Sequence, residues 1–383
     1  MEYRTFGHTG VEVSILGFGC MRLPVVEGDV TRIDEEKATE MVQHAIRMGV
    51  NYFDTAFPYH SASPAEGGAS EPFLGRALKN GYREKVYVAT KLPAWLVASP
   101  ADMDRFLDLQ LERLDSGPID FYLLHSLNRA SWGKLEQHGV VDFLERARKS
   151  GKIRFAGFSF HDEADLFTEI MERYAWDFCQ IMYNYFDEHF QAGRAGLHLA
   201  SERGVAAVVM EPLRGGALAD GLPQEAIREF RQVSPQRSAV EWAFRWLWRQ
   251  PEISTVLSGM TTMDQLVENL KLADTVPGQN WTEADRLAID RVNKILKDRQ
   301  RVACTSCGYC MPCPQGVDIP RNFMLCNDHY MLNDRGATIR YFRLLQASQR
   351  ASACIQCGEC LDKCPQQILI PDELEHVVEL FEP

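Results

Sequence analysis

An alternation of short β-rich runs with longer charged segments between residues 11 and 260 constrains the fold more than any other feature. Helix-like stretches such as 34–49 and 238–250 separate the β-rich runs. This pattern is typical of repeated βα units and a parallel sheet. Eight units predict an α/β protein of the (β/α)8 (TIM) barrel class. The strand-like runs are residues 12–20, 51–56, 86–92, 120–126, 153–160, 177–184, 205–213 and 253–260.

An open doubly wound sheet is the alternative architecture for the same alternation. Such a sheet usually carries a G-x-G-x-x-G turn after its first strand when it binds a dinucleotide, and that motif is absent here. The barrel is therefore the favoured interpretation. Residues 3–14 precede the first unit and indicate a β-hairpin with Gly7 and Gly10 at its turn, which we expect to cap one end of the barrel.

The length of the chain predicts a second, smaller domain. A single core stops growing at roughly 250 to 300 residues, and this chain has 383. A Pro- and Gly-containing segment over 275–280 precedes a long helical pattern over 282–301. We therefore predict a barrel over residues 1–280, a connecting helix over 281–300, and a small, mostly α-helical domain over 301–383.

The net charge of −12 argues against a nucleic acid or an anionic membrane surface as a partner, because both attract basic patches. No stretch approaches the 18 or so apolar residues of a membrane span, and the first residues contain no apolar signal segment. The sequence predicts a soluble cytoplasmic protein whose partners are small molecules or other proteins.

Four polar residues stand at or just after the ends of three successive strand-like runs: Asp54, Tyr59, Lys91 and His125. Active sites of (β/α)8 barrels form at the C-terminal ends of the strands. Each residue alone has an ordinary structural explanation, but an acid, a phenol, an amine and an imidazole on one rim suit the reduction of a carbonyl. Tyr59 would donate the proton, Lys91 would lower the pKa of that phenol, Asp54 would hold Lys91, and His125 would orient the carbonyl.

These residues resemble those of the aldo-keto reductase family over roughly residues 1–274. The resemblance lies in "FDTAFPY", "TKL" and "RLDSGPIDFYLLH". It implies that the four residues form a catalytic tetrad and that a nicotinamide nucleotide, NAD(H) or NADP(H), binds without a Rossmann domain. It also implies that Ser159 and Gln180 contact the nicotinamide amide. The pyrophosphate would lie against Glu211, Pro212, Leu213, Arg214, Gly215 and Gly216, and the adenosine end against Ser258, Gln265, Glu268 and Asn269.

Two departures from the family pattern leave the cofactor open. Phe160 and His161 follow Ser159 where the family commonly has an asparagine, and His161 is either a substitute donor or an ordinary loop residue. The aromatic residue that commonly stacks on the nicotinamide is replaced around Met210. A flavin is therefore an alternative cofactor. The loop after the eighth strand has no lysine or arginine before Lys271, which favours NADH over NADPH.

Eight of the eleven cysteines form two runs that indicate metal binding. The runs are C-x2-C-x2-C-x2-C-P and C-x2-C-x2-C-x3-C-P, and they predict two [4Fe-4S] clusters with the fourth cysteine of each run on the other cluster. Zinc is the alternative metal. The first run is one residue short before its last cysteine, and Cys326 is the only nearby alternative to Cys313 as a ligand. Cys20 and Cys179 are expected to be buried. The predicted ligand sets are Cys304, Cys307, Cys310 and Cys364 for one cluster, and Cys354, Cys357, Cys360 and Cys313 for the other.

Residues 300–383 resemble the helical dicluster ferredoxin domains that are attached to some redox enzymes, and the whole chain resembles the aldo-keto reductase subgroup that carries such a domain. Three functions follow as hypotheses. The first is a carbonyl-reducing oxidoreductase that exchanges electrons through its clusters with a ferredoxin or another carrier. The second is a carbonyl reductase dependent on NAD(P)H whose clusters are structural or sense oxygen. The third is an electron-transfer protein whose barrel does not catalyse.

Overall fold

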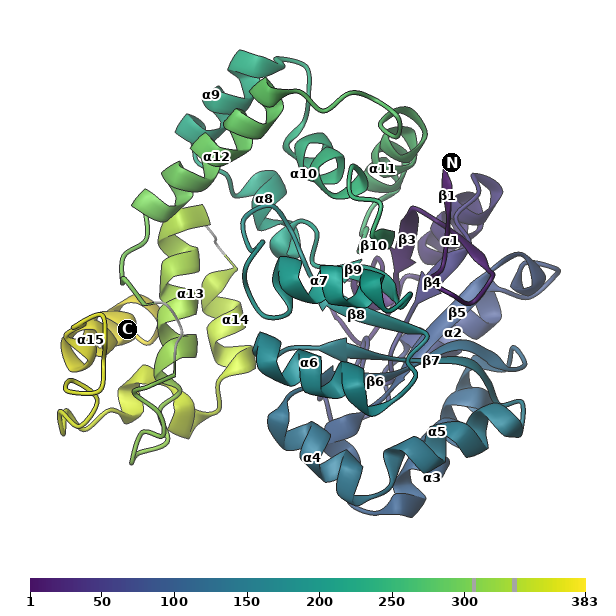
Figure 1. The fold of residues 1–383 in the computed structure, drawn as a ribbon, viewed down its shortest axis with the longest axis horizontal. Coiled ribbons are helices and arrows are strands. Elements are labelled where there is room, and N and C mark those ends of the chain that lie inside the picture. The colour runs from purple at the N-terminus through teal and green to yellow at the C-terminus, as the bar shows by residue number, and fades with distance from the viewer. Residues whose placement is uncertain (305–307, 333–335) are drawn as a thin grey trace. The chain divides into compact units, whose positions relative to one another are not determined.

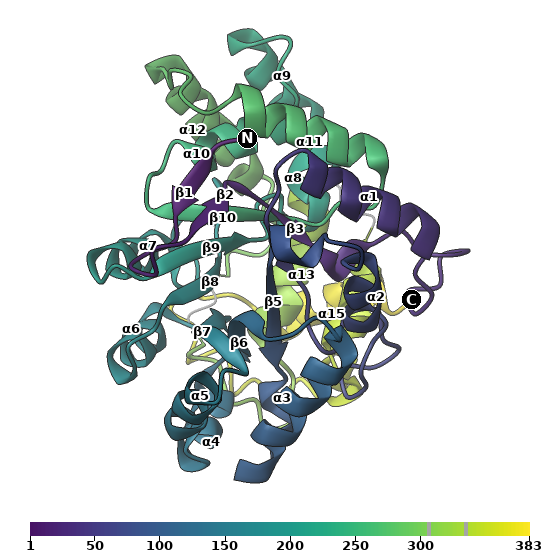
Figure 2. The same ribbon diagram turned by 90° about the vertical axis from the view of Figure 1, so that its right-hand side faces the viewer.

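Eight parallel strands close into a barrel in the computed structural model, which describes residues 1–304, 308–332 and 336–383 (Figures 1 and 2). The order around the barrel is β10-β3-β4-β5-β6-β7-β8-β9. One barrel strand lies in each predicted run, which confirms the barrel and rejects the open sheet. The strands are β3 (Leu16–Gly19), β4 (Tyr52–Asp54), β5 (Tyr87–Leu92), β6 (Ile119–Leu127), β7 (Ile153–Phe160), β8 (Phe178–Met182), β9 (Ala206–Met210) and β10 (Ile253–Ser258).

The run 12–20 contains two strands, so its assignment to a single strand was wrong. Its first part is β2 (Glu12–Ser14), which pairs antiparallel with β1 (Tyr3–Thr5) and forms the predicted hairpin. Gly7 in the hairpin turn has φ +53°, and a Cβ there would lie 2.5 Å from the carbonyl oxygen of Gly204. Only glycine fits this close approach of two backbone segments.

The hairpin closes the end of the barrel at which the strands begin. Phe6 and Val13 belong to the same buried cluster as Tyr52 and Phe121, which face them from inside the barrel. The rings of Phe6 and Phe121 are 4.5 Å apart. The expected cap is confirmed, and it leaves the opposite rim for chemistry.

Helices surround the barrel, as Figure 2 shows. The start of α3 illustrates their local signals, because Ser99 and Asp102 form a capping box and Pro100 occupies the first turn. The α-helices of this part are α1 (Glu35–Arg47), α2 (Ser70–Ala77), α3 (Pro100–Leu114), α4 (Arg129–Gln137), α5 (Val140–Lys149), α6 (Ala164–Arg173), α7 (Gly193–Glu202), α10 (Ala239–Trp248) and α11 (Met263–Thr275). Short 3-10 helices are η1 (Cys20–Arg22), η2 (Arg83–Lys85) and η3 (Ala94–Leu96).

The chain divides into two compact units, of which the first comprises residues 1–212 and 243–280 and the second residues 213–242 and 281–383. One of the divisions falls between Asn280 and Trp281, and the three-part division expected from the sequence stays a prediction. The grouping of residues 213–242 with the C-terminal part was not expected. Elements of the second unit are η4 (Arg214–Gly216), α8 (Ala217–Asp220), α9 (Gln224–Val233), α12 (Glu283–Asp298), α13 (Ile319–Leu332), α14 (Ala337–Leu344), η5 (Ala347–Gln349), η6 (Ala351–Ala353) and α15 (Ile370–Phe381).

Packing of α9 against α12 explains this grouping. The ring of Phe230 in α9 stacks on Trp242 at 4.6 Å. The guanidinium of Arg237 forms an ion pair with Asp285, whose side chain is only 1% exposed. A buried carboxylate of this kind requires its partner, so residues 213–242 are tied to the helix that follows the barrel.

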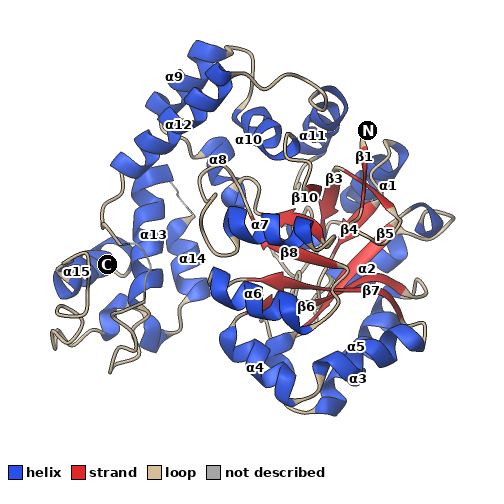
Figure 3. Cartoon of the chain, in the orientation of Figure 1, coloured by secondary structure: helices blue, strands red, loops and turns tan. Residues whose placement is uncertain are grey.

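The C-terminal part of the second unit is helical, and no strand occurs among its described residues (Figure 3). α13, α14 and α15 share an apolar core in which Tyr341 stacks on Phe381 at 4.7 Å. The predicted helical character of this region is confirmed. In the described residues of the whole chain, no helix combines the length and apolar composition required to cross a bilayer.

Candidate active site and cluster sites

The four predicted catalytic residues meet at the rim where the barrel strands end. Asp54 is the last residue of β4, and Tyr59 lies in the loop that follows it. Lys91 is the penultimate residue of β5, and His125 lies near the end of β6. Parallel pairing of β4 with β5 and of β5 with β6 brings these strand ends together.

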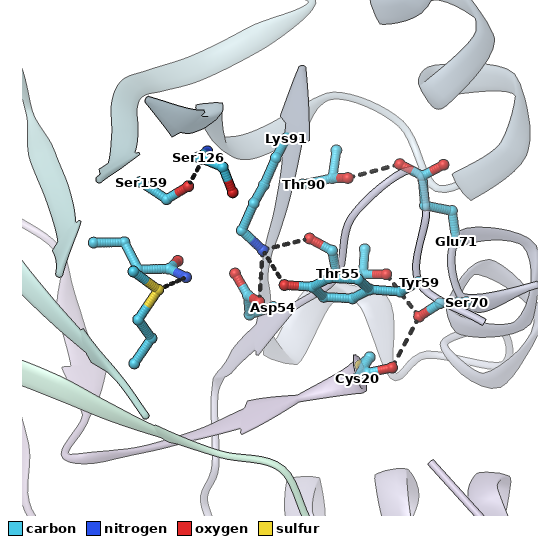
Figure 4. A network of polar contacts seen from close by, with 12 residues as sticks. Cys20, Asp54, Thr55, Tyr59, Ser70, Glu71, Thr90, Lys91, Ser126 and Ser159 are labelled. Carbon is cyan, nitrogen blue, oxygen red and sulfur yellow. Dashed lines mark hydrogen bonds and ion pairs between the residues drawn. The ribbon is translucent and has the colours of Figure 1, made fainter. Parts of the chain in front are cut away.

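Lys91 is the centre of this group (Figure 4). Its ammonium donates to Asp54 Oδ1 at 2.7 Å, to the backbone oxygen of Thr55 at 2.8 Å and to Tyr59 Oη at 3.3 Å. An ammonium has three N–H donors, and all three have an acceptor here. The position of Nζ relative to the phenol is therefore fixed by Asp54 and Thr55.

Burial and pairing act in opposite directions on the charges of this site. Burial lowers the pKa of Lys91, but Asp54 and Tyr59 together raise it above its usual value. Burial raises the pKa of Asp54, and Lys91 opposes this change. The two groups form a buried ion pair. Either charge alone would lose its hydration on burial without the electrostatic attraction that compensates for that loss.

The pKa of Tyr59 is raised, because the effect of burial exceeds the lowering by Lys91. Lys91 lowers the pKa of Tyr59, as expected, but it does not bring that pKa below its usual value. A phenolate in a buried site loses hydration, and one ammonium at 3.3 Å does not compensate for that loss. The phenol consequently keeps its proton at neutral pH.

A β-bulge positions His125. The register between β6 and β7 shifts after Leu124, and Ser126 within the shift has φ +53°. Bulges beside active sites redirect side chains. The ring of His125 lies 6.1 Å from that of Tyr59.

The imidazole of His125 is neutral at pH 7. Burial, then Lys91 and His161, lower its pKa well below the usual value. A neutral imidazole retains one N–H donor. In the described part of the structure, Nδ1 of His125 has no hydrogen-bond partner.

The sequence interpretation missed Trp95, which lies in η3 just after the strand of Lys91. Its ring is 5.1 Å from that of His125 and 37% exposed. Its Nε1 donates to the backbone oxygen of Pro64 at 3.1 Å, which fixes the ring. An aromatic residue four positions after Lys91 was the available sequence signal.

Ser159 and Gln180 are neighbours in the register of β7 and β8. Ser159 Oγ accepts from the backbone N–H of Ser126 at 2.7 Å, so its own hydroxyl proton is available to a ligand. Gln180 Nε2 lies 3.4 Å from the sulfur of Met210. A flexible thioether therefore stands beside Gln180, where the family resemblance implies an aromatic ring.

The predicted pyrophosphate loop divides between the two units. Glu211 and Pro212 belong to the first unit, and Leu213, Arg214, Gly215 and Gly216 to the second. Arg214 forms an ion pair at 2.8 Å with Asp328 of α13, which also pairs with Arg340 of α14 at 3.2 Å. Arg214, which was expected to bind the pyrophosphate, is thus paired with an acidic residue of α13.

Polar groups of the loop after β10 bind mainly to one another. Asn269 Nδ2 donates to Ser258 Oγ at 3.0 Å, and Gln265 Oε1 accepts from the backbone N–H of Thr261 at 2.8 Å. The side chain of Glu268 is exposed. An additional basic residue lies close by, because a Cβ on Gly259 would be 3.1 Å from Cδ of Arg22 in η1.

One cavity of the second unit is lined by a complete predicted cluster set. Its lining includes Cys313 together with Cys354, Cys357 and Cys360. Cys310, which also lines the second cavity described below, reaches this one too. Three thiols of the second run therefore share a space with Cys313 of the first, as a crossed pair of clusters requires. The donor set fits a [4Fe-4S] cluster.

A second cavity is lined by Cys304, Cys310 and Cys364. The fourth predicted ligand, Cys307, lies outside the described residues. In the described ranges, no three Cys, His, Asp or Glu side chains form a site for a single metal ion. The thiols line the wall of a cavity instead. The residues around this cavity also fit a four-iron cluster.

The three remaining cysteines are buried. Cys20, Cys179 and Cys326 are each 0% exposed, which confirms the expectation for the first two. Burial raises the pKa of Cys326 to about 12, so this thiol is a poor source of thiolate. Cys326 packs in the apolar core of the second unit, and it is absent from the lining of both cavities.

Comparisons with known families match two parts of the chain. Residues 15–288 match the aldo/keto reductase family, and residues 303–369 match a 4Fe-4S dicluster domain. The second match supports iron–sulfur clusters over zinc at the two cysteine runs.

Individual relatives resemble the barrel part. L-galactose dehydrogenase of Arabidopsis thaliana is 29% identical over 315 residues, which cover 76% of this chain and 91% of that protein. An uncharacterized oxidoreductase of Bacillus subtilis, YqkF, is 24% identical over 72% of this chain and 92% of its own length. Among solved structures, the holo form of aldo-keto reductase AKR11C1 from Bacillus halodurans has a TM-score of 0.62 at 25% identity and covers 76% of this chain and 96% of its own.

Proposed function

The chain belongs to the aldo/keto reductase family and carries a 4Fe-4S dicluster domain at its C-terminal end, and we propose that it reduces a carbonyl compound and exchanges electrons through two clusters. The contact of Lys91 with both Asp54 and Tyr59, beside His125, carries the barrel part of this proposal. The two cysteine-lined cavities support the cluster part.

Reduction of a carbonyl adds a hydride to carbon and a proton to oxygen. A nicotinamide nucleotide would supply the hydride when bound, and Ser159 and Gln180 would hold its amide. Tyr59 Oη donates its proton to the carbonyl oxygen, and the ammonium of Lys91 stabilises the phenolate that remains. His125 donates one hydrogen bond that orients the carbonyl. Asp54 keeps Lys91 charged.

Cys304, Cys307, Cys310 and Cys364 would hold one cluster, and Cys313, Cys354, Cys357 and Cys360 the other. Bound clusters supply one-electron redox chemistry. Two single electrons from a reduced carrier, together with two protons, balance the conversion of one carbonyl to an alcohol. Coupling of this supply to a hydride requires a group that handles both, such as a flavin.

A second candidate function is a carbonyl reductase dependent on NAD(P)H whose clusters are structural. One observation favours it. Cys304, Cys310 and Cys313 pack against the apolar core of the second unit, and so do Cys354, Cys360 and Cys364. Clusters at these positions would tie that core together, whether or not electrons pass through them.

Cofactor analysis of anaerobically purified protein, followed by a turnover assay, tests the proposal. Iron, sulfide, flavin and nicotinamide are counted first. A panel of aldehydes and ketones is then offered with a reduced ferredoxin or with NAD(P)H. Alcohol formed with two equivalents of ferredoxin consumed supports electron exchange through the clusters. Alcohol formed only with NAD(P)H, while the clusters stay oxidised, supports the second candidate. No alcohol with any donor would overturn both and favour a barrel that does not catalyse.

A further inference from the structure

We propose that α14 and the segment after it form the docking surface for a small acidic one-electron carrier protein. This inference rests on the electron exchange proposed above. The surface, called the α14 surface here, consists of Ile339, Phe342, Arg343, Leu344 and Arg350.

One face of α14 is buried and the other is apolar and exposed. Ala337 and Tyr341 lie in the core of the second unit. On the other face, Ile339 is 72% exposed and Phe342 is 43% exposed, and Leu344, the last residue of the helix, is 45% exposed. A surface helix normally presents polar residues outward. Clustered exposed apolar side chains mark a site of interaction.

The charge of the α14 surface is opposite to that of the chain. Between Asp334 and Glu359 the sequence contains four arginines and no acidic residue, although the chain carries a net charge of −12. In the described part of the structure, Arg343 has no acidic partner within 4.0 Å, and the partners of Arg350 are the backbone oxygens of Leu345 and Phe342.

Two nearby acids are already engaged. Asp328 pairs with Arg340, and Glu382 accepts hydrogen bonds from Tyr341 and Ser352. The α14 surface therefore remains basic, which favours an acidic partner. A second copy of the chain is disfavoured, because a two-fold interface would bring two identical basic surfaces together.

Arg350 and Phe342 form a preorganised contact. The guanidinium carbon of Arg350 lies 4.7 Å from the centroid of the Phe342 ring. Arginine and aromatic residues are enriched in protein interfaces. Side chains held in place before binding lose less entropy when a partner docks.

The α14 surface is also connected to one cluster cavity. The backbone oxygen of Gln349 accepts from the N–H of Asp318 at 3.0 Å, so the segment after α14 lies against the loop that follows Cys313. Arg350 precedes Cys354 by four residues, a separation of at most about 14 Å along an extended chain. Cys313 and Cys354 line the same cavity. A carrier on this surface would dock close to the cluster held there.

Stopped-flow reduction of the full-length protein, with its clusters loaded, tests the surface. The probe is a chemically reduced, strongly acidic two-cluster ferredoxin, and the signal is bleaching of the cluster absorption in the protein. Arg343→Glu should lower the second-order rate constant about threefold or more at low salt, and the difference should shrink at high salt. Phe342→Ala should lower it at both salt concentrations. Arg231→Glu, which makes the same charge change at an exposed position of α9, should have little effect.

Reduction by dithionite separates docking from damage to the clusters, and it should be equal in wild type and variants. A fast wild-type reaction with ferredoxin that Arg343→Glu leaves unchanged would overturn the α14 surface. So would slowing by Lys363→Glu alone, which would move docking to the second cysteine run. A wild-type dimer that Arg343→Glu converts to a monomer would assign the surface to a second copy. If dithionite reduces the wild-type clusters but ferredoxin does not, the result would contradict the proposed electron exchange. The docking surface, which rests on that exchange, would then be rejected as well.

Discussion

Lys91 Nζ lies 2.7 Å from Asp54 Oδ1, and the two side chains are 0% and 4% exposed. The same barrel contains a second ion pair with a buried acid. Arg113 Nε lies 2.8 Å from Oε2 of Glu71, and the side chain of Glu71 is 0% exposed. Loss of one partner of such a pair typically destabilises a protein by about 3–5 kcal/mol. The two pairs therefore allow the structural and catalytic roles of a buried carboxylate to be distinguished.

Asp54→Asn should reduce both stability and activity, whereas Glu71→Gln should reduce stability alone. The neutral amide of the first variant would leave the ammonium of Lys91 without a counter-charge beside Tyr59. Carbonyl reduction should fall by roughly 10²-fold or more. Denaturant unfolding and steady-state kinetics check both variants. Equal activity losses in the two would contradict the role given to Asp54.

Tyr59→Phe should abolish most carbonyl reduction and leave nucleotide affinity nearly unchanged. The phenol donates a proton to the substrate oxygen, and loss of general-acid catalysis typically costs about 10²- to 10⁴-fold in rate. Tyr183→Phe is the matched control, because Tyr183 Oη bonds Gln250 elsewhere in the barrel. Near-normal turnover of Tyr59→Phe would show that another group supplies the proton.

His125 should make the stability of the protein depend on pH on the acidic side. Its pKa in the folded protein is lowered well below the usual 6.5, mainly by burial. The unfolded chain therefore binds more protons below pH 6.5, so this contribution to stability is present above pH 6.5 and is lost as pH falls. His125→Gln should flatten the decrease in melting temperature below pH 6.5. An unchanged slope would mean that His125 takes up its proton over the same pH range in the folded and unfolded protein.

Anaerobic protein should contain about eight irons and eight sulfides, from two four-iron clusters. Cys313→Ala and Cys364→Ala should each remove one cluster, because each thiol lines a different cavity. Cys326→Ala should keep all eight irons. Stoichiometric zinc, or loss of iron in Cys326→Ala alone, would contradict the assignment.

NADH should bind at least as well as NADPH. The loop after β10 offers neutral donors, and hydrogen bonds between neutral groups contribute roughly 0.5–1.5 kcal/mol against about 1.5–3 kcal/mol for charged ones. Arg22 beside Gly259 is the basic side chain that would compete with this expectation. Titration of both nucleotides at one salt concentration measures this preference. A tenfold preference for NADPH that disappears in Arg22→Ala would identify Arg22 as the phosphate-binding residue.

Much of the fold and of the candidate site follows from the sequence alone. Eight alternating β-rich and helical segments predict the barrel, because a parallel strand must be followed by a crossover helix. Strand-end positions were sufficient to select Asp54, Lys91 and His125, since parallel strands deliver their C-terminal residues to one rim. The spacing of the cysteines predicts iron–sulfur clusters in the same way, because three of the four predicted ligands of each cluster lie close together along the chain.

Tertiary structure decided the properties that depend on neighbours distant in sequence. The raised pKa of Tyr59 results from burial, which no local pattern records. Trp95 faces His125, and Arg214 faces Asp328, only because the chain brings these pairs together. Residues 213–242 belong to the C-terminal unit because α9 packs against α12. Sequence periodicity specifies which face of a helix is apolar, but the partner that covers it is selected by packing of the whole chain.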